Sequence, residues 1–193
     1  MMKTIQIEVP DMEYKKGNTT LKIYQEMHPL NPREWDNNGI MHCWHSRYKL
    51  GDIPSSPPDY VESEDNDAKQ LIPSIYVCLP LYLYDHSSLS ISTNLPSCNW
   101  DTSQIGYIYT TLQKLSEMGH AELPAKDKVI EWLKSEVEEY NQYLQGDVWR
   151  FELFEDEELV DSCSGFFGTN FNENGLLDHA GIQSLDDWEE IIQ

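Results

Sequence analysis

Lysine and arginine are absent from the end of this sequence. Residues 151–193 contain neither, but they hold twelve aspartates and glutamates. They form the densest part of a formal net charge of −21 on 193 residues. Charge of one sign at this density destabilises a compact fold through self-repulsion, so folding alone does not explain the excess. It repels nucleic acid and anionic lipid, and it favours a binding protein over an enzyme.

Long hydrophobic runs are also missing. No stretch approaches the ~20 apolar residues that a membrane-spanning helix needs. The first six residues, MMKTIQ, contain no hydrophobic signal region. We therefore expect a cytoplasmic protein that has no membrane partner and does not bind DNA or RNA directly.

Cysteine is scarce and scattered. Cys43, Cys78, Cys98 and Cys163 include no Cys-x-x-Cys pair, which predicts free thiols in a reducing compartment. The only tight group of soft metal ligands is His42-Cys43-x-His45. A zinc site needs about four ligands, and in a strand His42 and His45 would point to opposite faces. We therefore predict neither a metal site nor a cofactor.

Sequence signatures of catalysis are missing as well. The chain has no Gly-rich phosphate loop and no Gly-x-Ser-x-Gly nucleophile elbow. Asp85-His86 and Asp178-His179 are adjacent pairs, and sequence neighbours rarely form a proton relay. These absences predict a protein that is not an enzyme. The alternative from another class is a small hydrolase with a dispersed His/Asp/Cys site, using His42, His45, Asp85 and His86.

The apolar residues that are present predict one domain over residues 1–193. Alternation predicts strands at Ile5 to Val9, 21–24 and 41–45, with a turn at Lys16-Gly17-Asn18 between the first two. Residues 51–74 are rich in proline, serine and acidic side chains near their start. This composition is typical of a mobile acidic loop.

The second half of the chain carries the strongest periodic patterns. Residues 75–84 are apolar on both strand faces and are followed by expected strands at 89–92 and 106–110. Apolar residues at 3-4-3-4 spacing predict a helix over 126–144. A hairpin is expected over 148–163 and a tail helix over 184–192. The predicted fold is α+β: an antiparallel sheet with one long amphipathic helix packed on it, an acidic C-terminal hairpin and a tail helix.

Acidic side chains gather on the predicted helix and hairpin. Carboxylates four residues apart on a helix stand ~6 Å apart along the axis, close to the spacing of phosphates along one DNA strand. This similarity suggests a phosphate-like surface. The candidate partner-binding residues are Asp127, Glu131, Glu138, Glu139, Glu152, Glu155, Asp156, Glu157, Glu158 and Asp161.

Five segments together resemble a known family. They are MHCWHSRY (41–48), LPLYLYDHS (79–87), SCNWD (97–101) with QIG (104–106), the stretch 136–147 and DSC (161–163). They resemble a family of small acidic proteins carried by phages and mobile elements of Gram-positive bacteria. The resemblance carries over no catalytic residue. It implies a context, because such elements often encode small acidic inhibitors of host defence, including anti-CRISPR and anti-restriction proteins.

The functional expectation combines charge and context. We expect an anti-defence inhibitor, an acidic nucleic-acid mimic that binds the basic DNA/RNA-binding surface of a CRISPR effector or restriction enzyme. A homodimer remains one possible state, since extended DNA mimics often double their length by dimerising. The alternative of an accessory or regulatory mobile-element protein whose acidity only keeps it in solution also stays open.

Overall fold

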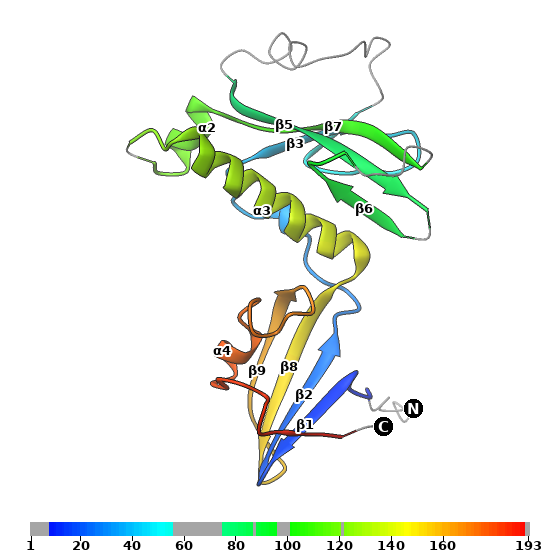
Figure 1. Cartoon of the computed structure of the whole chain (residues 1–193), viewed down its shortest axis with the longest axis vertical. Coiled ribbons are helices and arrows are strands. Elements are labelled where there is room, and N and C mark those ends of the chain that lie inside the picture. Colours follow the sequence, from blue (N-terminus) through cyan, green and yellow to red (C-terminus); the bar gives the residue numbers. More distant parts are fainter. Residues whose placement is uncertain (1–7, 56–74, 87, 96–100, 121, 192–193) are drawn as a thin grey trace, which may run out of the picture. The chain divides into compact units, whose positions relative to one another are not determined.

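The chain forms two compact units. A computed structural model describes residues 8–55, 75–86, 88–95, 101–120 and 122–191. The terminal unit joins Met1–Leu30 to Gly146–Gln193, and the central unit is Asn31–Gln145. Each has its own five-stranded sheet and its own hydrophobic core (Figure 1). The sequence predicts one domain; the structure has two units because both ends of the chain enter one sheet.

The terminal unit is an antiparallel sheet in the order β10-β1-β2-β8-β9. Its strands are β1 (Met12–Lys16), β2 (Thr19–Gln25), β8 (Val148–Glu155), β9 (Glu158–Phe167) and β10 (Glu189–Glu190). The expected turn at Lys16-Gly17-Asn18 joins β1 to β2. The strand expected at Ile5 to Val9 is not supported: Val9 precedes β1 as an exposed loop residue, and Ile5 and Ile7 lie outside the described residues.

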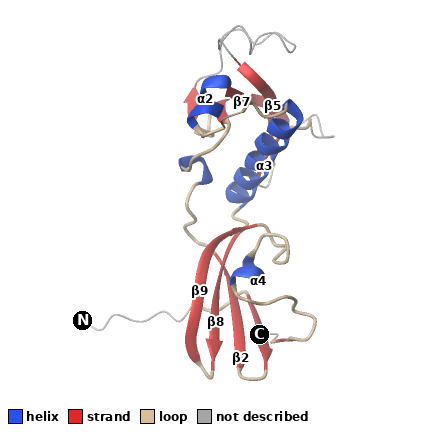
Figure 2. Cartoon of the chain, turned by 90° about the vertical axis from the view of Figure 1, so that its left-hand side faces the viewer, coloured by secondary structure: helices blue, strands red, loops and turns tan. Residues whose placement is uncertain are grey.

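One face of this sheet is covered by the C-terminal segment that holds α4 (Leu176–His179), as Figure 2 shows. Leu21, Ile23 and Phe151 on the sheet are at most 1% exposed. They pack with Leu176 and Leu177. Burying each such side chain stabilises the fold by roughly 1.5–3 kcal/mol.

The predicted tail helix over 184–192 is wrong. Ser184 Oγ accepts a hydrogen bond from the backbone N–H of Asp186 at 3.0 Å, but the chain then turns instead of continuing as a helix. Trp188 packs against the core of the terminal unit, and Glu189–Glu190 pair with Lys15 and Tyr14 of β1. Tertiary packing and strand pairing therefore override the local helix-start pattern.

The central unit has a sheet in the order β4-β3-β7-β5-β6. Its elements are η1 (Pro32–Glu34), β3 (Ile40–Trp44), β4 (Ile53–Ser55), β5 (Ile75–Asp85), β6 (Leu89–Ser92), β7 (Thr102–Thr111), α2 (Leu112–Glu117) and α3 (Lys126–Gln145). Among the described strands of this unit, β4 pairs in parallel with β3, and the other pairs are antiparallel. Residues 51–55, expected to begin a mobile loop, form a turn and β4, and residues 56–74 lie outside the described part.

Helix α3 packs on one face of this sheet through the stripe that the sequence predicts. Leu133, Val137 and Tyr140 are at most 3% exposed and lie in one cluster with Met41 and Leu81 of the strands. The fold is thus mixed α+β, with one long helix. Among the described residues, no helix is both long enough and apolar enough to cross a membrane.

Candidate functional site

The candidate acidic residues are divided between the two units. Asp127, Glu131, Glu138 and Glu139 lie on α3 in the central unit. The other six lie on the β8–β9 hairpin of the terminal unit: Glu152, Glu155, Asp156, Glu157, Glu158 and Asp161. Each unit therefore carries its own group of candidate residues. The terminal unit is the more acidic for its size, with 17 acidic and 5 basic residues in 78 positions, against 17 and 8 in 115.

The tip of the β8–β9 hairpin is a two-residue turn made of acidic residues. Glu155 pairs with Glu158, which leaves Asp156 and Glu157 as the turn. Their φ angles are +49° and +70°, the left-handed combination of a type I′ turn. Asn-Gly and Asp-Gly are the usual sequences there, since asparagine and aspartate tolerate positive φ at the first position and glycine suits the second. The hairpin therefore holds Glu157 where its backbone favours glycine, whereas Asp156 suits its position.

The neighbouring β1–β2 turn anchors this tip. Asn18 Nδ2 donates to Asp156 Oδ1 at 2.5 Å, and the backbone N–H of Asp156 donates to the carbonyl of Asn18 at 3.1 Å. The two turns lie at the same end of the sheet because Thr19 of β2 pairs with Glu155 of β8. The acidic tip is thus held by hydrogen bonds rather than by a positive charge.

Positive charges near the hairpin are already engaged. Lys16 is 3.7 Å from Asp187, and Lys22 lies over the Phe154 ring. Arg150 binds Glu8 at 2.7 Å and Glu152 at 3.0 Å. In the described part of the chain, Glu155, Glu157 and Glu158 form no ion pair and no side-chain hydrogen bond, and all three are exposed.

Glu152 differs from the other predicted hairpin residues. It is half-buried, binds Arg150 and accepts a hydrogen bond from the Tyr24 hydroxyl at 3.0 Å. Burial and this hydrogen bond to Glu152 raise the pKa of Tyr24 to about 12. Glu152 thus belongs to an internal network on the sheet, and its charge is largely committed there.

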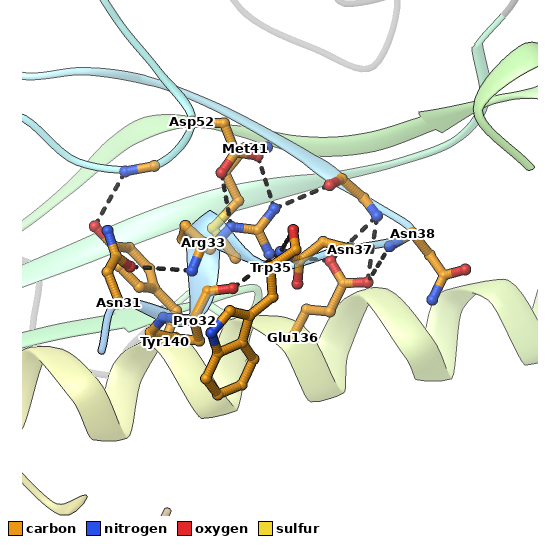
Figure 3. A network of polar contacts seen from close by, with 12 residues as sticks. Asn31, Pro32, Arg33, Trp35, Asn37, Asn38, Met41, Asp52, Glu136 and Tyr140 are labelled. Carbon is orange, nitrogen blue, oxygen red and sulfur yellow. Dashed lines mark hydrogen bonds and ion pairs between the residues drawn. The ribbon is translucent and has the colours of Figure 1, made fainter. Parts of the chain in front are cut away.

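On α3, the strongest polar network surrounds a carboxylate next to the predicted ones. Arg33 is buried, and its guanidinium donates to Asp52 at 2.7 and 2.9 Å and to Glu136 at 3.0 Å (Figure 3). It also donates to the carbonyl of Gly39 at 2.9 Å. Burial opposes the charge of Arg33, but the hydrogen bonds and charges of Asp52 and Glu136 outweigh it and raise its pKa.

Local geometry brings these groups together. Asn31 caps η1 by accepting the backbone N–H of Arg33 at 3.0 Å, and Gly51, at φ +68°, turns the chain so that Asp52 reaches Arg33. Asp52 also accepts the N–H of Met41, and Glu136 accepts those of Asn38 and Gly39. Every partner is satisfied, so this network stabilises the central unit and is not a free binding site.

Glu139, one turn beyond Glu136, is partly buried. Burial and the charge of Glu136 raise the pKa of Glu139, and Arg33 offsets them only in part. The folded protein therefore binds this proton more tightly than the unfolded chain does. Stability from the protonated form is present below the unfolded pKa and is lost as the pH rises through the folded pKa.

We expect the Glu139→Gln variant to be more stable than the wild type at pH 7, by less than about 1 kcal/mol because the site is half-exposed. The difference should vanish below about pH 4, where the wild-type carboxyl is protonated. Urea unfolding at both pH values measures it. The matched control is Glu138→Gln, at an exposed neighbouring position, which should change stability little. A Glu139→Gln variant less stable at pH 7 contradicts the assignment.

The residues of the alternative hydrolase site have separate partners. Asp85 binds Arg47 and accepts the Tyr48 hydroxyl at 3.5 Å. His45 stacks on Tyr48, and its Nδ1 accepts backbone N–H groups. His86 stacks on Tyr84, and His42 meets Trp44 edge to face. No hydrogen bond between any of these histidines and Asp85 is found among the described residues.

Potential metal ligands and cysteine thiols are likewise dispersed over the described residues. Within the described part of the chain, no three His, Cys, Asp or Glu side chains lie close enough to hold a metal ion. Cys43, Cys78 and Cys163 form no disulfide, and Cys98 lies outside that part. Burial raises the pKa of the Cys43 thiol to about 12, which makes it a poor nucleophile at neutral pH.

Comparison of the chain with protein-family models, with curated proteins and with solved structures found no match. Sequence reasoning located the acidic hairpin and missed the internal roles of Glu136 and Glu152. Their only sequence signal is position: Glu136 borders the apolar stripe of α3, and Glu152 lies two residues after Arg150 on β8, opposite Lys22 of β2.

Proposed function

We propose that this protein is a non-enzymatic inhibitor of host defence that acts in the cytoplasm of the host cell. Its acidic hairpin imitates nucleic acid, binds the basic DNA/RNA-binding surface of a defence effector and blocks nucleic-acid access. The effector is a CRISPR nuclease or a restriction enzyme. The sequence resemblance to small acidic proteins of phages and mobile elements supports the context.

The β8–β9 tip is the observation that carries the proposal. Four consecutive carboxylates, Glu155 to Glu158, surround a turn whose two central residues adopt positive φ. The mutual repulsion of these carboxylates and the backbone strain at Glu157 both destabilise the fold, and no positive charge among the described residues pairs with Glu155, Glu157 or Glu158. Strain of this kind is typical of functional positions. A surface that serves only solubility needs neither the strain nor the concentration of charge at one tip.

A DNA-cleavage assay tests the proposal. Purified protein is added, before or after DNA, to a reconstituted CRISPR effector and to a restriction enzyme. A nucleic-acid mimic should inhibit cleavage when added first and lose effect when DNA is already bound. A gel shift at low salt, where electrostatic attraction is strongest, should show no binding of the protein to DNA itself. Saturable DNA binding, or equal inhibition in both orders of addition, contradicts mimicry.

We expect Glu157→Gly to raise the free energy of unfolding by about 1 kcal/mol, because glycine adopts φ +70° without the left-handed penalty. Denaturant unfolding measures the change. The control is Glu158→Gly, which removes the same charge from a β9 position and should lower stability by roughly 0.5–1 kcal/mol. Equal effects of the two variants would show that charge relief, and not backbone strain, dominates at the tip.

A further inference from the structure

The two edge strands of the terminal sheet differ in length and in the segment that forms them. At one edge, β10 pairs with β1, and the N–H of Ile191 donates to the carbonyl of Glu13 at 2.8 Å. At the other edge, β8 is the only strand of the described residues that pairs with β9. Figure 2 shows β9 as the outermost strand of its sheet. The C-terminal segment thus closes the β1 edge and leaves the β9 edge open.

The open edge presents backbone hydrogen-bonding groups. The N–H of Ser162 donates to the neighbouring carboxylate, Asp161 Oδ1, at 2.8 Å, a group on its own strand rather than on β8. Residues alternate in an antiparallel ladder, so the N–H and C=O of Ser164 face the same way. Both side chains are small and exposed, which lets another backbone approach closely. Such an edge is a template for an added strand.

Apolar side chains accompany this edge. Leu159 is 56% exposed and Val160 is 50% exposed, directly after the acidic tip. Val160 is the extra residue of a bulge, because Leu153 pairs with Asp161 and Phe154 pairs with Leu159. These two aliphatic side chains add apolar surface to the edge beside its carboxylates. The combination of apolar and charged groups is typical of a protein interface.

The charges along β9 determine which kind of strand can bind at this edge. Glu158 and Asp161 are the only charged residues of β9, Glu155 ends β8, and Glu157 lies in the turn just before β9. A second copy of this chain would bring the same carboxylates against them, and like charges suppress such pairing. A strand bearing lysine or arginine gains attraction where an acidic strand is repelled.

We infer that the β9 edge, from Glu158 to Ser164, binds an extended segment of the partner protein that carries lysine or arginine alternating with apolar residues. The segment adds a sixth strand to the terminal sheet. Its cations meet Glu158 and Asp161, and its apolar side chains meet Leu159 and Val160. This inference rests on the proposed function, since it specifies how the basic partner engages the acidic hairpin.

The test uses the full-length protein and a fluorescein-labelled eight-residue peptide that alternates lysine with valine. The wild type should bind it saturably in fluorescence anisotropy at low salt. Ser162→Pro removes the outward N–H without touching the ladder to β8 and should weaken binding at least about tenfold. Ser162→Ala, which keeps the N–H, should stay within about threefold of wild type. A lysine–proline peptide of equal charge should bind as weakly as the peptide binds Ser162→Pro.

Hydrogen exchange gives a second measurement that does not depend on the proline variant folding. Bound lysine–valine peptide should protect the Ser162 and Ser164 amides of the wild type. Equal binding by Ser162→Pro and wild type, with both amides unprotected, overturns strand addition while leaving the acidic-surface proposal standing. If the wild-type protein does not inhibit DNA cleavage in the earlier assay, the proposed function is wrong, whatever the peptide result. A wild-type dimer in sedimentation that Ser162→Pro dissociates would identify a second copy as the occupant and overturn the inference.

Discussion

Replacing Arg33 with methionine should lower the free energy of unfolding of the central unit by about 3–5 kcal/mol. The guanidinium is buried and binds two carboxylates, Asp52 and Glu136, that are themselves largely enclosed. Methionine fills similar space but leaves both negative charges without a counter-charge. Breaking a buried pair in this way is far more destabilising than removing an exposed one, because uncompensated charge stays in a poorly hydrated site.

Urea unfolding followed by tryptophan fluorescence measures this loss. The matched control is Arg47→Met in the same unit, where the arginine side chain is 66% exposed and pairs with Asp85. It should cost less than about 1 kcal/mol, as exposed pairs do. Adding Asp52→Asn and Glu136→Gln to Arg33→Met should recover part of the stability, because neutral amides still accept the backbone N–H groups. A loss at Arg33 no larger than that at Arg47 would contradict the structural role.

Local elements of this fold could be predicted from the sequence because their signals are local. The apolar stripe that predicts a helix over 126–144 becomes α3, and the alternation at 148–163 becomes β8 and β9. The division into two units could not be predicted in this way. It depends on β2 pairing with β8, for example Ile23 with Phe151, and periodicity within a strand does not specify a partner so far along the chain.

The same limit separates the predicted site residues from their roles. Exposed carboxylates at the hairpin tip follow from a turn between two strands, and the structure places Glu155 to Glu158 there. The buried network depends on Arg33 meeting Glu136, which lies 103 positions away. The backbone strain at Glu157 could not be predicted either, since four acidic residues in a row suggest solvation rather than positive φ. The hairpin is therefore a stronger candidate surface than α3.

Reversing the hairpin tip to lysine should abolish inhibition. In the variant Glu155→Lys, Asp156→Lys, Glu157→Lys and Glu158→Lys, each attraction to a basic partner becomes a repulsion, and affinity should fall at least about 100-fold. The fold should survive, because the three glutamates are exposed and make no ion pair among the described residues, while Asp156 loses only its hydrogen bond from Asn18. Stability should change little or rise, since a chain with net charge −21 gains from reduced self-repulsion.

A control variant separates position from charge. Asp101, Glu122, Glu173 and Asp178 are exposed carboxylates elsewhere in the chain, and reversing these four changes the net charge by the same amount. Inhibition of DNA cleavage and thermal melting are measured for both variants at low and high salt. The control should inhibit almost as well as wild type, and wild-type inhibition itself should weaken with salt because exposed charges are screened. An equal loss of inhibition in both variants would show that net charge alone acts. Full inhibition by the tip variant would exclude the hairpin and leave the exposed carboxylates of α3 as the candidate site.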